Sequence, residues 1–181
     1  MVGPARASVR DLSAEERPAA VPILIDSFVG IYRWHAKRTL REIERVRGAE
    51  RDGELLGVSM LERLVPEVGY VYYIAVRSAV RGQGIGARLL DDALALFTGA
   101  GVRVVYAAAE EENRASLALF RSHGFRPVER EEPGWREGGL GAWGLRSRMR
   151  VVHGEVLLGR RLAPEPTATS PQTSGSSRRW D

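Results

Sequence analysis

The stretch Arg81–Gly86 reads RGQGIG and has the composition of a turn that binds phosphate groups. Three glycines in five positions let the backbone approach a ligand closely. A helical pattern follows, because Leu90, Leu94 and Phe97 recur with the spacing of one helix face. A helix N-terminus presents unpaired N–H donors and a partial positive charge. The sequence therefore predicts a pyrophosphate site at this turn, with Arg81 as an additional cation.

Two common phosphate-binding motifs do not fit this turn. A Walker A loop requires a lysine after its last glycine, and Ala87 stands there. A dinucleotide fingerprint requires a third glycine, but Ala87 or Leu89 occupies that position, which leaves only the permissive GxGxxA form. The turn also follows about 70 residues of predicted helices and hairpin, whereas a Rossmann domain normally begins with its fingerprint. A glycine-rich connector without a ligand remains the alternative for the turn taken alone.

A second motif makes the pattern more specific. It begins at Asn113, 27 residues after Gly86, and ends on a Gly-Phe pair. The two segments, in this order and spacing, resemble motifs A and B of the GNAT superfamily of N-acetyltransferases. The residues that carry the resemblance are Ile74-Ala75-Val76, Arg81, Gly84, Gly86, Leu89-Leu90, Asn113, Ser116, Leu119-Phe120 and Gly124-Phe125.

The resemblance implies that acetyl-CoA is the cosubstrate and lies in an opening of the sheet. The amides of Arg81–Gly86 would bind its pyrophosphate, and the edge of Ile74–Val76 would pair with its pantetheine arm like an added strand. Asn113 would also contact it, which is compatible with a role as helix cap. The implied cofactor-binding residues are Ile74, Ala75, Val76, Arg81, Gly82, Gln83, Gly84, Ile85, Gly86, Ala87, Asn113 and Phe120.

The resemblance also implies a direct reaction, in which a neutral amine attacks the thioester and the backbone N–H of Val76 stabilises the oxyanion. The usual acid is a tyrosine, but this chain has Phe120, which cannot donate a proton. The glutamate base of the ribosomal-protein acetyltransferases is replaced by Ala108, which argues against that subfamily. Catalysis remains feasible, because a thiol pKa of ~8.5 makes thiolate a tolerable leaving group.

The resemblance also implies candidates for the proton acceptor on the strand before the glycine-rich turn, where Tyr70 and Tyr72 stand at positions that carry His or Glu in other members of the family. Tyr70 and Tyr72 alternate along this strand, so both should point to one face. Each could relay a proton through water or could be a structural aromatic of the sheet core. Glu62 and Glu67 are further candidates near the acceptor opening, with a solvated surface charge as the alternative. We take Tyr70, Tyr72 and Glu62 as candidate catalytic residues, and we expect no metal, because no ligand cluster is visible.

Several elements must position these residues. A helix is predicted over Tyr32–Glu44. A hairpin is predicted from Val46–Arg51 and Leu55–Leu64, because the intervening Asp52-Gly53 tolerates positive φ at both positions. Glu155–Leu162 reads as a final strand. Residues 132–154 are rich in glycine and suggest an insertion or long loop with an extra strand.

The fold class implied by the resemblance is α/β (α+β mixed). The GNAT fold has a twisted, mixed, six- to seven-stranded sheet with helices on both faces. A V-shaped splay is expected between two central parallel strands, here Gly69–Val76 and Val102–Ala108. We expect one acetyltransferase domain over residues 7–162. Residues 163–181 are rich in Pro, Ser and Thr and predict a disordered tail.

Composition limits the remaining possibilities. The 181-residue chain has no cysteine, which excludes disulfides and a cysteine nucleophile. No secretory signal or membrane-spanning run is visible, so we expect a cytoplasmic protein without a membrane partner. The net charge is +4, but the arginines are scattered, so no nucleic-acid partner is expected. The expected partners are acetyl-CoA and an amine acceptor, and a homodimer is left open.

Two function classes remain. The first is an N-acetyltransferase that acts on a primary amine of a small molecule or peptide. The alternative is a GNAT module that binds acyl-CoA without efficient turnover and serves as a sensor or regulator. The replacements at Phe120 and Ala108 are the features that favour this alternative.

Overall fold

The computed structural model describes residues 6–128, 149 and 154–162, and its core is one seven-stranded sheet. The strand order is β1-β2-β3-β4-β5-β7-β6, and all neighbours are antiparallel except the parallel pair β4–β5. The predicted mixed sheet is therefore confirmed. The elements are β1 (Ser8–Asp11), η1 (Arg17–Ala20), α1 (Val21–Ser27), α2 (Gly30–Glu42), β2 (Arg45–Arg51), β3 (Glu54–Val65), β4 (Val68–Val76), η2 (Ser78–Val80), α3 (Ile85–Gly99), β5 (Val104–Glu110), α4 (Arg114–Ser122), β6 (Arg126–Pro127) and β7 (Glu155–Arg161).

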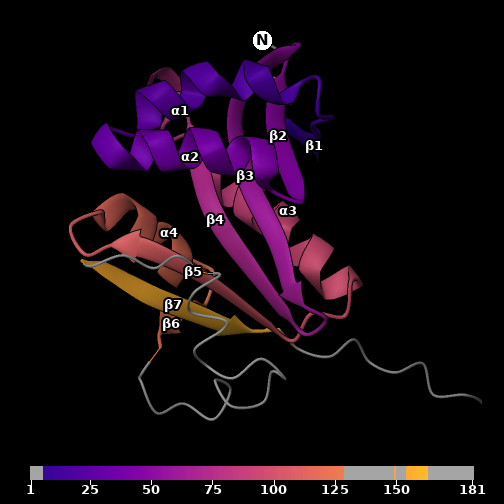
Figure 1. Ribbon diagram of the computed structural model, residues 1–181, viewed down its shortest axis with the longest axis vertical. Coiled ribbons are helices and arrows are strands. Elements are labelled where there is room, and N and C mark those ends of the chain that lie inside the picture. The colour runs from indigo at the N-terminus through magenta and orange to yellow at the C-terminus, as the bar shows by residue number, and fades with distance from the viewer. Residues whose placement is uncertain (1–5, 129–148, 150–153, 163–181) are drawn as a thin grey trace, which may run out of the picture.

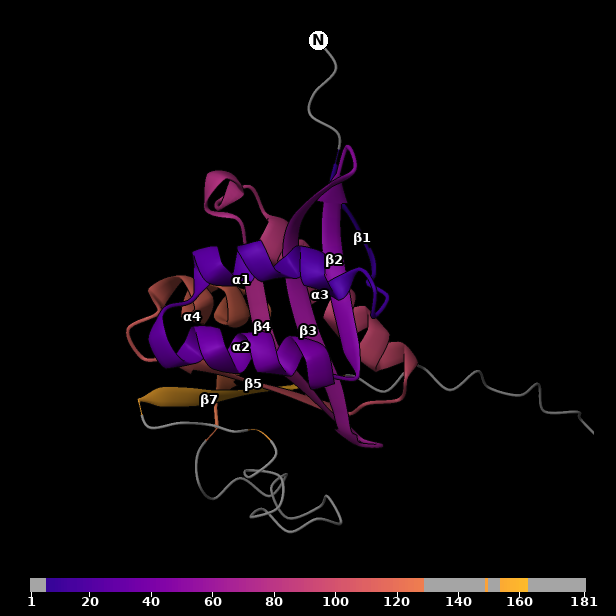
Figure 2. The same ribbon diagram turned by 45° about the horizontal axis from the view of Figure 1, so that its top comes forward.

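Helices cover both faces of the sheet, as expected. Helices α1 and α2 lie on one face, where Leu24 and Leu40 pack with Met60 of β3. Helices α3 and α4 lie on the other face, where Leu90 and Phe120 belong to a second core cluster (Figures 1 and 2). Each pair of helices buries apolar residues against its own face of the sheet. The sheet therefore lies between two layers of helices.

The two central strands separate at one end. β4 and β5 are paired only from Val68 opposite Val104 to Val71 opposite Ala107. β4 continues to Val76 and β5 to Glu110 without further pairing between them. Figure 1 shows the two strands close together at one end and far apart at the other. The predicted V-shaped splay is therefore present.

The predicted turn at Asp52-Gly53 is confirmed, whereas the predicted bounds of one helix and one strand differ by about two residues. Asp52 and Gly53 both have positive φ, 51° and 79°, and join β2 to β3. The helix predicted over Tyr32–Glu44 runs instead from Gly30 to Glu42. The strand predicted over 102–108 was placed two residues too early, because pairing with β7 extends β5 to Glu110.

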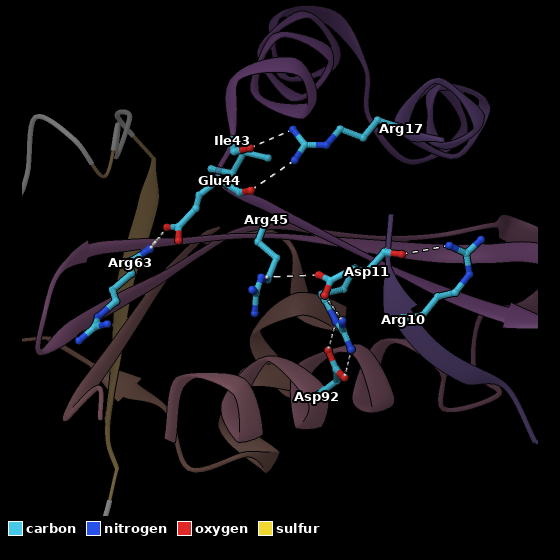
Figure 3. Close-up of polar contacts among 9 residues, drawn as sticks. Arg10, Asp11, Arg17, Ile43, Glu44, Arg45, Arg63 and Asp92 are labelled. Atoms are coloured by element: carbon cyan, nitrogen blue, oxygen red, sulfur yellow. Dashed lines mark hydrogen bonds and ion pairs between the residues drawn. The ribbon is translucent and has the colours of Figure 1, made fainter. Parts of the chain in front are cut away.

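A partly buried ion pair fixes helix α3 against the sheet. The guanidinium of Arg47 on β2 donates two hydrogen bonds of 2.7 Å to the carboxylate of Asp92 on α3. A third contact of 2.9 Å joins the same guanidinium to Asp11 of β1. Figure 3 shows Asp92 and Asp11 at this junction. Bidentate arginine–carboxylate pairs restrict orientation, so this contact sets how α3 lies on the sheet.

Gly57 allows α3 to approach the sheet closely, and Gly57→Ala is expected to lower the free energy of unfolding by about 2 kcal/mol through overpacking. A methyl group there would lie 2.9 Å from the backbone oxygen of Ala75 and 3.1 Å from side-chain carbons of Ile85 and Leu89. Urea denaturation of the variant measures the effect.

Gly99→Ala is the matched control for this prediction. No atom lies within 4 Å of a methyl group at Gly99, which is the last residue of α3. Its stability should be unchanged or slightly higher, because alanine favours helix more than glycine does. Equal denaturation midpoints for the two variants would contradict close packing at Gly57.

Two sequence predictions lie outside the described residues. They are the disordered tail at 163–181 and the insertion at 132–154, of which only Met149 and Gly154 are described. Within the part of the chain that the structure describes, no helix is long and apolar enough to cross a membrane.

Candidate active site

The glycine-rich turn forms the start of helix α3, as predicted. Gly84 is the N-cap residue and has φ of 78°, and Gly82 has φ of 77°. The first bond of the helix runs from the N–H of Arg88 to the carbonyl of Gly84 at 3.1 Å. The three preceding amides, those of Ile85, Gly86 and Ala87, therefore have no acceptor within the helix. Because glycine has no side chain to cap them, these donors can bind the oxygens of a phosphate group.

The side chain of Arg81 makes hydrogen bonds within the protein, and its predicted phosphate contact stays a prediction. Its Nε donates to the carbonyl of Val76 at 3.0 Å, and its terminal nitrogen lies 3.2 Å from the carbonyl of Asp26 and 3.3 Å from Oγ of Ser27. The guanidinium thus joins the end of β4 to the end of α1. It therefore helps to fix the glycine-rich turn relative to the end of α1.

A pocket of about 410 Å³ passes through the splay between β4 and β5. Phe28 and Thr39 line it from the helices on one face, and Ser116 and Leu119 line it from α4 on the other face. Residues from opposite faces can share one pocket here because the sheet is open between its central strands. The pocket therefore offers a route from one face of the sheet to the other.

The turn at α3 adjoins this pocket. A methyl group on Gly86 would lie 3.4 Å from Leu119 and 4.0 Å from Ile74, and both of these residues line the pocket. The free amides of α3 and the pocket are thus neighbours on the α3–α4 face. A long ligand with a phosphate group at one point and a narrow arm beyond it fits this arrangement.

The edge of β4 in the splay is only partly available for pairing. The N–H of Arg77 donates to Leu56 of β3 at 2.9 Å, so alternation directs the amide groups of Val76 and Ile74 toward the opening. Ala75 is paired with Val58 of β3. Of the predicted triplet, Ile74 and Val76 thus present backbone groups to a ligand. The carbonyl of Val76 already accepts the bond from Arg81, which leaves its N–H as the donor.

Helix α4 brings Asn113 and Phe120 to the pocket. Oδ1 of Asn113 accepts the N–H of Ser116 at 3.0 Å, so the predicted helix cap is confirmed. The side-chain amide still has its N–H donors, and the residue lines the pocket. Phe120 is buried, lines the pocket and packs edge-to-face on Phe125 with ring centroids 5.2 Å apart.

Tyrosines form much of the pocket wall on the α2 face. The rings of Tyr70 and Tyr72 are in edge contact at 4.6 Å, which confirms that they share a face. Tyr72 has no partner in the register of β3 and β4, because Leu61 pairs with Val71 and the next residue of β3, Met60, pairs with Tyr73. This bulge places Tyr73 on the same face and in the same pocket, which strict alternation would not predict.

The surroundings of Tyr70 favour its neutral, protonated form. Burial raises the pKa of Tyr70 well above 10, and the negative charge of Glu155 adds to this shift. A proton is therefore held at neutral pH, and Tyr70 cannot accept one directly.

The two glutamates proposed as bases lie outside the pocket. Glu62 lines an adjoining groove, which shares Thr39 and Tyr72 with the pocket. Glu67 lies in the turn between β3 and β4, where its carbonyl accepts the N–H of Arg103 at 2.9 Å. This is the closed end of the V, so the prediction that Glu67 lies near the acceptor opening is wrong.

Glu110, Glu155 and Tyr32 are among the polar residues of the pocket that sequence reasoning missed. Burial, together with the nearby carboxylates of Glu155 and Glu110, raises the pKa of Tyr32 to about 12. The expected strand ended at Ala108, so Glu110 appeared to belong to a loop. The pairing of Glu110 with Glu155 could not be predicted, because it joins strands far apart in the sequence.

Comparisons with known proteins agree with this geometry. The profile of the Acetyltransferase (GNAT) family matches residues 7–125. N-alpha-acetyltransferase RimI of Mycobacterium tuberculosis is 36% identical over 126 residues, which cover 66% of this chain and 78% of that protein.

Solved structures share the fold at low sequence identity. A GNAT family acetyltransferase from Elizabethkingia anophelis with acetyl-CoA bound has a TM-score of 0.65 and 19% identity, over 86% of this chain and 98% of that chain. The ribosomal-protein-S18-alanine N-acetyltransferase from Escherichia coli has a TM-score of 0.64 and 18% identity, over 89% and 98%.

Proposed function

The chain belongs to the acetyltransferase (GNAT) family and is an acetyl-CoA-dependent N-acetyltransferase. We propose that its two substrates reach the pocket from opposite faces of the sheet. Acetyl-CoA enters from the α3–α4 face, and the acceptor amine enters from the α2 face. The observation that carries this proposal is the single pocket that residues of both faces line through the splay. The acceptor is a primary amine of a small molecule or peptide.

On the cosubstrate side, we assign the contacts with acetyl-CoA mainly to backbone groups of the protein. The amides of Ile85, Gly86 and Ala87 bind the pyrophosphate, supported by the turn from Arg81 to Gly84. The exposed backbone groups of Ile74 and Val76 hold the pantetheine arm. Asn113 and Phe120 border it from α4. Acetyl-CoA supplies an activated acetyl thioester at the centre of the splay.

On the acceptor side, the proposed catalytic groups are Tyr70 and Tyr72. Because Tyr70 keeps its proton, we assign it to hydrogen bonding of the incoming amine or of an ordered water. Tyr72 lies between the pocket and the groove that contains Glu62, so a proton could leave through water along this line. The N–H of Val76 is the proposed oxyanion donor.

Two observations bear on the acceptor and on the proton that it loses. Similarity to RimI of M. tuberculosis supports the α-amine of a peptide. Ala108 stands where the ribosomal-protein enzymes have a glutamate, which supports a different route for the proton. Nothing in the comparisons supports the alternative of a non-catalytic acyl-CoA module.

The setting of the enzyme is also a proposal. Residues 7–162 form the acetyltransferase domain, and the enzyme acts in the cytoplasm with no nucleic-acid or membrane partner. Scattered arginines and the absence of cysteine in the sequence support this setting. A homodimer is compatible with it.

Acetyl-CoA is expected to stabilise the fold by ~2.7 kcal/mol at a concentration of 100 Kd, because it binds only the folded state. A thermal melt with and without acetyl-CoA measures this shift. Turnover is then measured as thiol release with a panel of amines and N-terminal peptides. No thermal shift at millimolar acetyl-CoA would contradict the cosubstrate site, and a shift without thiol release from any amine would contradict the transferase proposal.

A further inference from the structure

The carboxylate of Asp26 bonds to the segment that leads into the glycine-rich turn. Asp26 lies in the last turn of α1, and its Oδ2 accepts the N–H of Ser78 at 2.6 Å. Ser78 is the first residue of η2, which separates β4 from the turn. A hydrogen bond to an ionised acceptor is stronger than one between neutral groups. This contact therefore joins a helix on the acceptor side of the sheet to the segment that carries the phosphate-binding amides.

Backbone hydrogen bonds continue from Ser78 to the start of α3. The carbonyl of Ser78 accepts the N–H of Arg81 at 3.3 Å, and the carbonyl of Val80 accepts the N–H of Gln83 at 3.4 Å. Gly84 follows as the N-cap residue of α3. Because each of these bonds closes a short turn, the position of Ser78 helps to set where the free amides of α3 lie.

The side chain of Arg81 makes a second link to the same end of α1. Its terminal nitrogen lies 3.2 Å from the carbonyl oxygen of Asp26 and 3.8 Å from the carboxylate of that residue. Its Nε donates to the carbonyl of Val76 at 3.0 Å. The end of α1, the end of β4 and the glycine-rich turn therefore meet at one junction.

The residues that follow Asp26 form part of the pocket wall. Ser27, Phe28 and Val29 all line the pocket. Oγ of Ser27 donates to the carbonyl of Val76 at 3.4 Å, and the ring of Phe28 packs edge-to-face on Tyr73 with centroids 5.2 Å apart. The junction thus fixes both the phosphate-binding turn and a wall of the acceptor side.

Stability does not explain an aspartate at this position. A negative charge in the last turn of a helix opposes the helix dipole, and the last turn of α1 has no basic residue. The side chains of Asp26 and Arg81 are 40% and 50% exposed, and an exposed ion pair contributes little to stability. The hydrogen bond from Ser78, together with the charges of Arg81 and Arg77, holds the pKa of Asp26 below its usual value. The carboxylate is therefore ionised at neutral pH and is an acceptor only.

We propose that Asp26 is a positioning residue for acetyl transfer. It holds the turn from Arg81 to Gly86 in the conformation that binds the phosphate groups of acetyl-CoA, and it aligns this turn with the pocket wall that begins at Ser27. Asp26 itself does not line the pocket, so it acts through Ser78 and Arg81. The inference rests on the proposed phosphate contacts of the turn, and it adds the side chain that orients them.

The first test is the affinity for acetyl-CoA, measured by calorimetry with the full chain. In Asp26→Ala, Kd should rise about tenfold, because the turn would adopt its binding conformation for only a fraction of the time. In Asp26→Asn, Kd should rise about threefold or less, because the amide oxygen still accepts the Ser78 N–H without the charge. Melting temperatures should change by less than about 2 °C, since an exposed ion pair contributes little to stability.

The second test removes the donor instead of the acceptor. Ser78→Pro deletes the N–H that Asp26 accepts, and proline is tolerated at the first position of a helix. Ser78 is exposed, and the preceding Arg77 has φ of −49° and ψ of 134°, which is compatible with a following proline. The variant should raise Kd about as much as Asp26→Ala does. The double variant should bind at most about threefold more weakly than the weaker single variant, whereas independent effects would multiply to about 100-fold.

The third test is turnover at saturating acetyl-CoA, with the amine that the parent acetylates fastest. In Asp26→Ala and in Ser78→Pro, kcat should fall about tenfold, because a small displacement of the reacting groups slows transfer. Glu15→Gln is the control for the loss of an exposed carboxylate, since Glu15 lies in the turn before η1. Its Kd for acetyl-CoA and its kcat should equal those of the parent.

These results separate the inference from the function on which it rests. An unchanged Kd or kcat in Asp26→Ala, multiplied effects in the double variant, or a large fall in melting temperature in both single variants would overturn the positioning role and leave the transferase proposal intact. Failure of the parent to bind acetyl-CoA would instead contradict the cosubstrate site and the inference with it. Thiol release from no amine would contradict the transferase proposal, and the affinity measurements would still decide whether Asp26 orients the turn.

Discussion

Gly86→Asp is expected to weaken acetyl-CoA binding by at least about 100-fold, because a like charge beside the pyrophosphate costs several kcal/mol. Gly86 is the second residue of α3, and its amide is one of the free donors of the first turn. A side chain fits there, since the backbone is not in the left-handed region and the nearest atom to a methyl group, on Leu119, is 3.4 Å away. An acidic residue in the first turn also favours the helix. Stability and affinity should therefore change in different directions.

Gly86→Asn is the matched control, because asparagine has the shape of aspartate without its charge. Calorimetry should show a much smaller loss of affinity for Asn than for Asp, and both variants should melt at or above the temperature of the parent. Gly84→Asp would be less informative, because φ of 78° strains any side chain at that position. Equal affinities for the parent and Gly86→Asp would place the phosphate groups elsewhere.

Phe120→Tyr is expected to raise kcat by about tenfold, since a positioned acid typically contributes 10²–10⁴-fold and the present enzyme works without one at this position. The ring lines the pocket from α4, on the side where the cosubstrate is proposed to enter. A hydroxyl added to this ring would supply a proton to the departing thiolate. Steady-state kinetics with saturating acetyl-CoA measures the gain, and KM for the acceptor should change little.

Phe125→Tyr separates this gain from a general effect of the hydroxyl. Phe125 packs edge-to-face on Phe120 but is 1% exposed and does not line the pocket. A hydroxyl there would be buried without a partner and should cost about 1–3 kcal/mol of stability, with no gain in kcat. If Phe120→Tyr behaves in the same way, with a lower melting temperature and unchanged kcat, the proposed position of Phe120 beside the leaving group is wrong.

The sequence by itself determined the features that depend on residues within a few positions of each other. The turn at Asp52-Gly53 and the cap at Asn113 were located correctly, and the helix expected over Ala87–Phe97 begins two residues earlier, at Ile85. Each depends on a local property, namely tolerance of positive φ or a side-chain oxygen at a helix N-terminus. The resemblance of the two motifs then led to the correct fold and to acetyl-CoA.

Only the tertiary structure decided which residues line the pocket. The guanidinium of Arg81 bonds to Val76 and to the end of α1, which no local pattern encodes. Tyr73 joins the pocket through a bulge that depends on pairing with β3. Glu110 and Glu155 are 45 residues apart and become neighbours only through the register of β5 and β7. Strand register and the packing of distant side chains are long-range properties, so local spacing along the chain could not reveal the acidic side of the pocket.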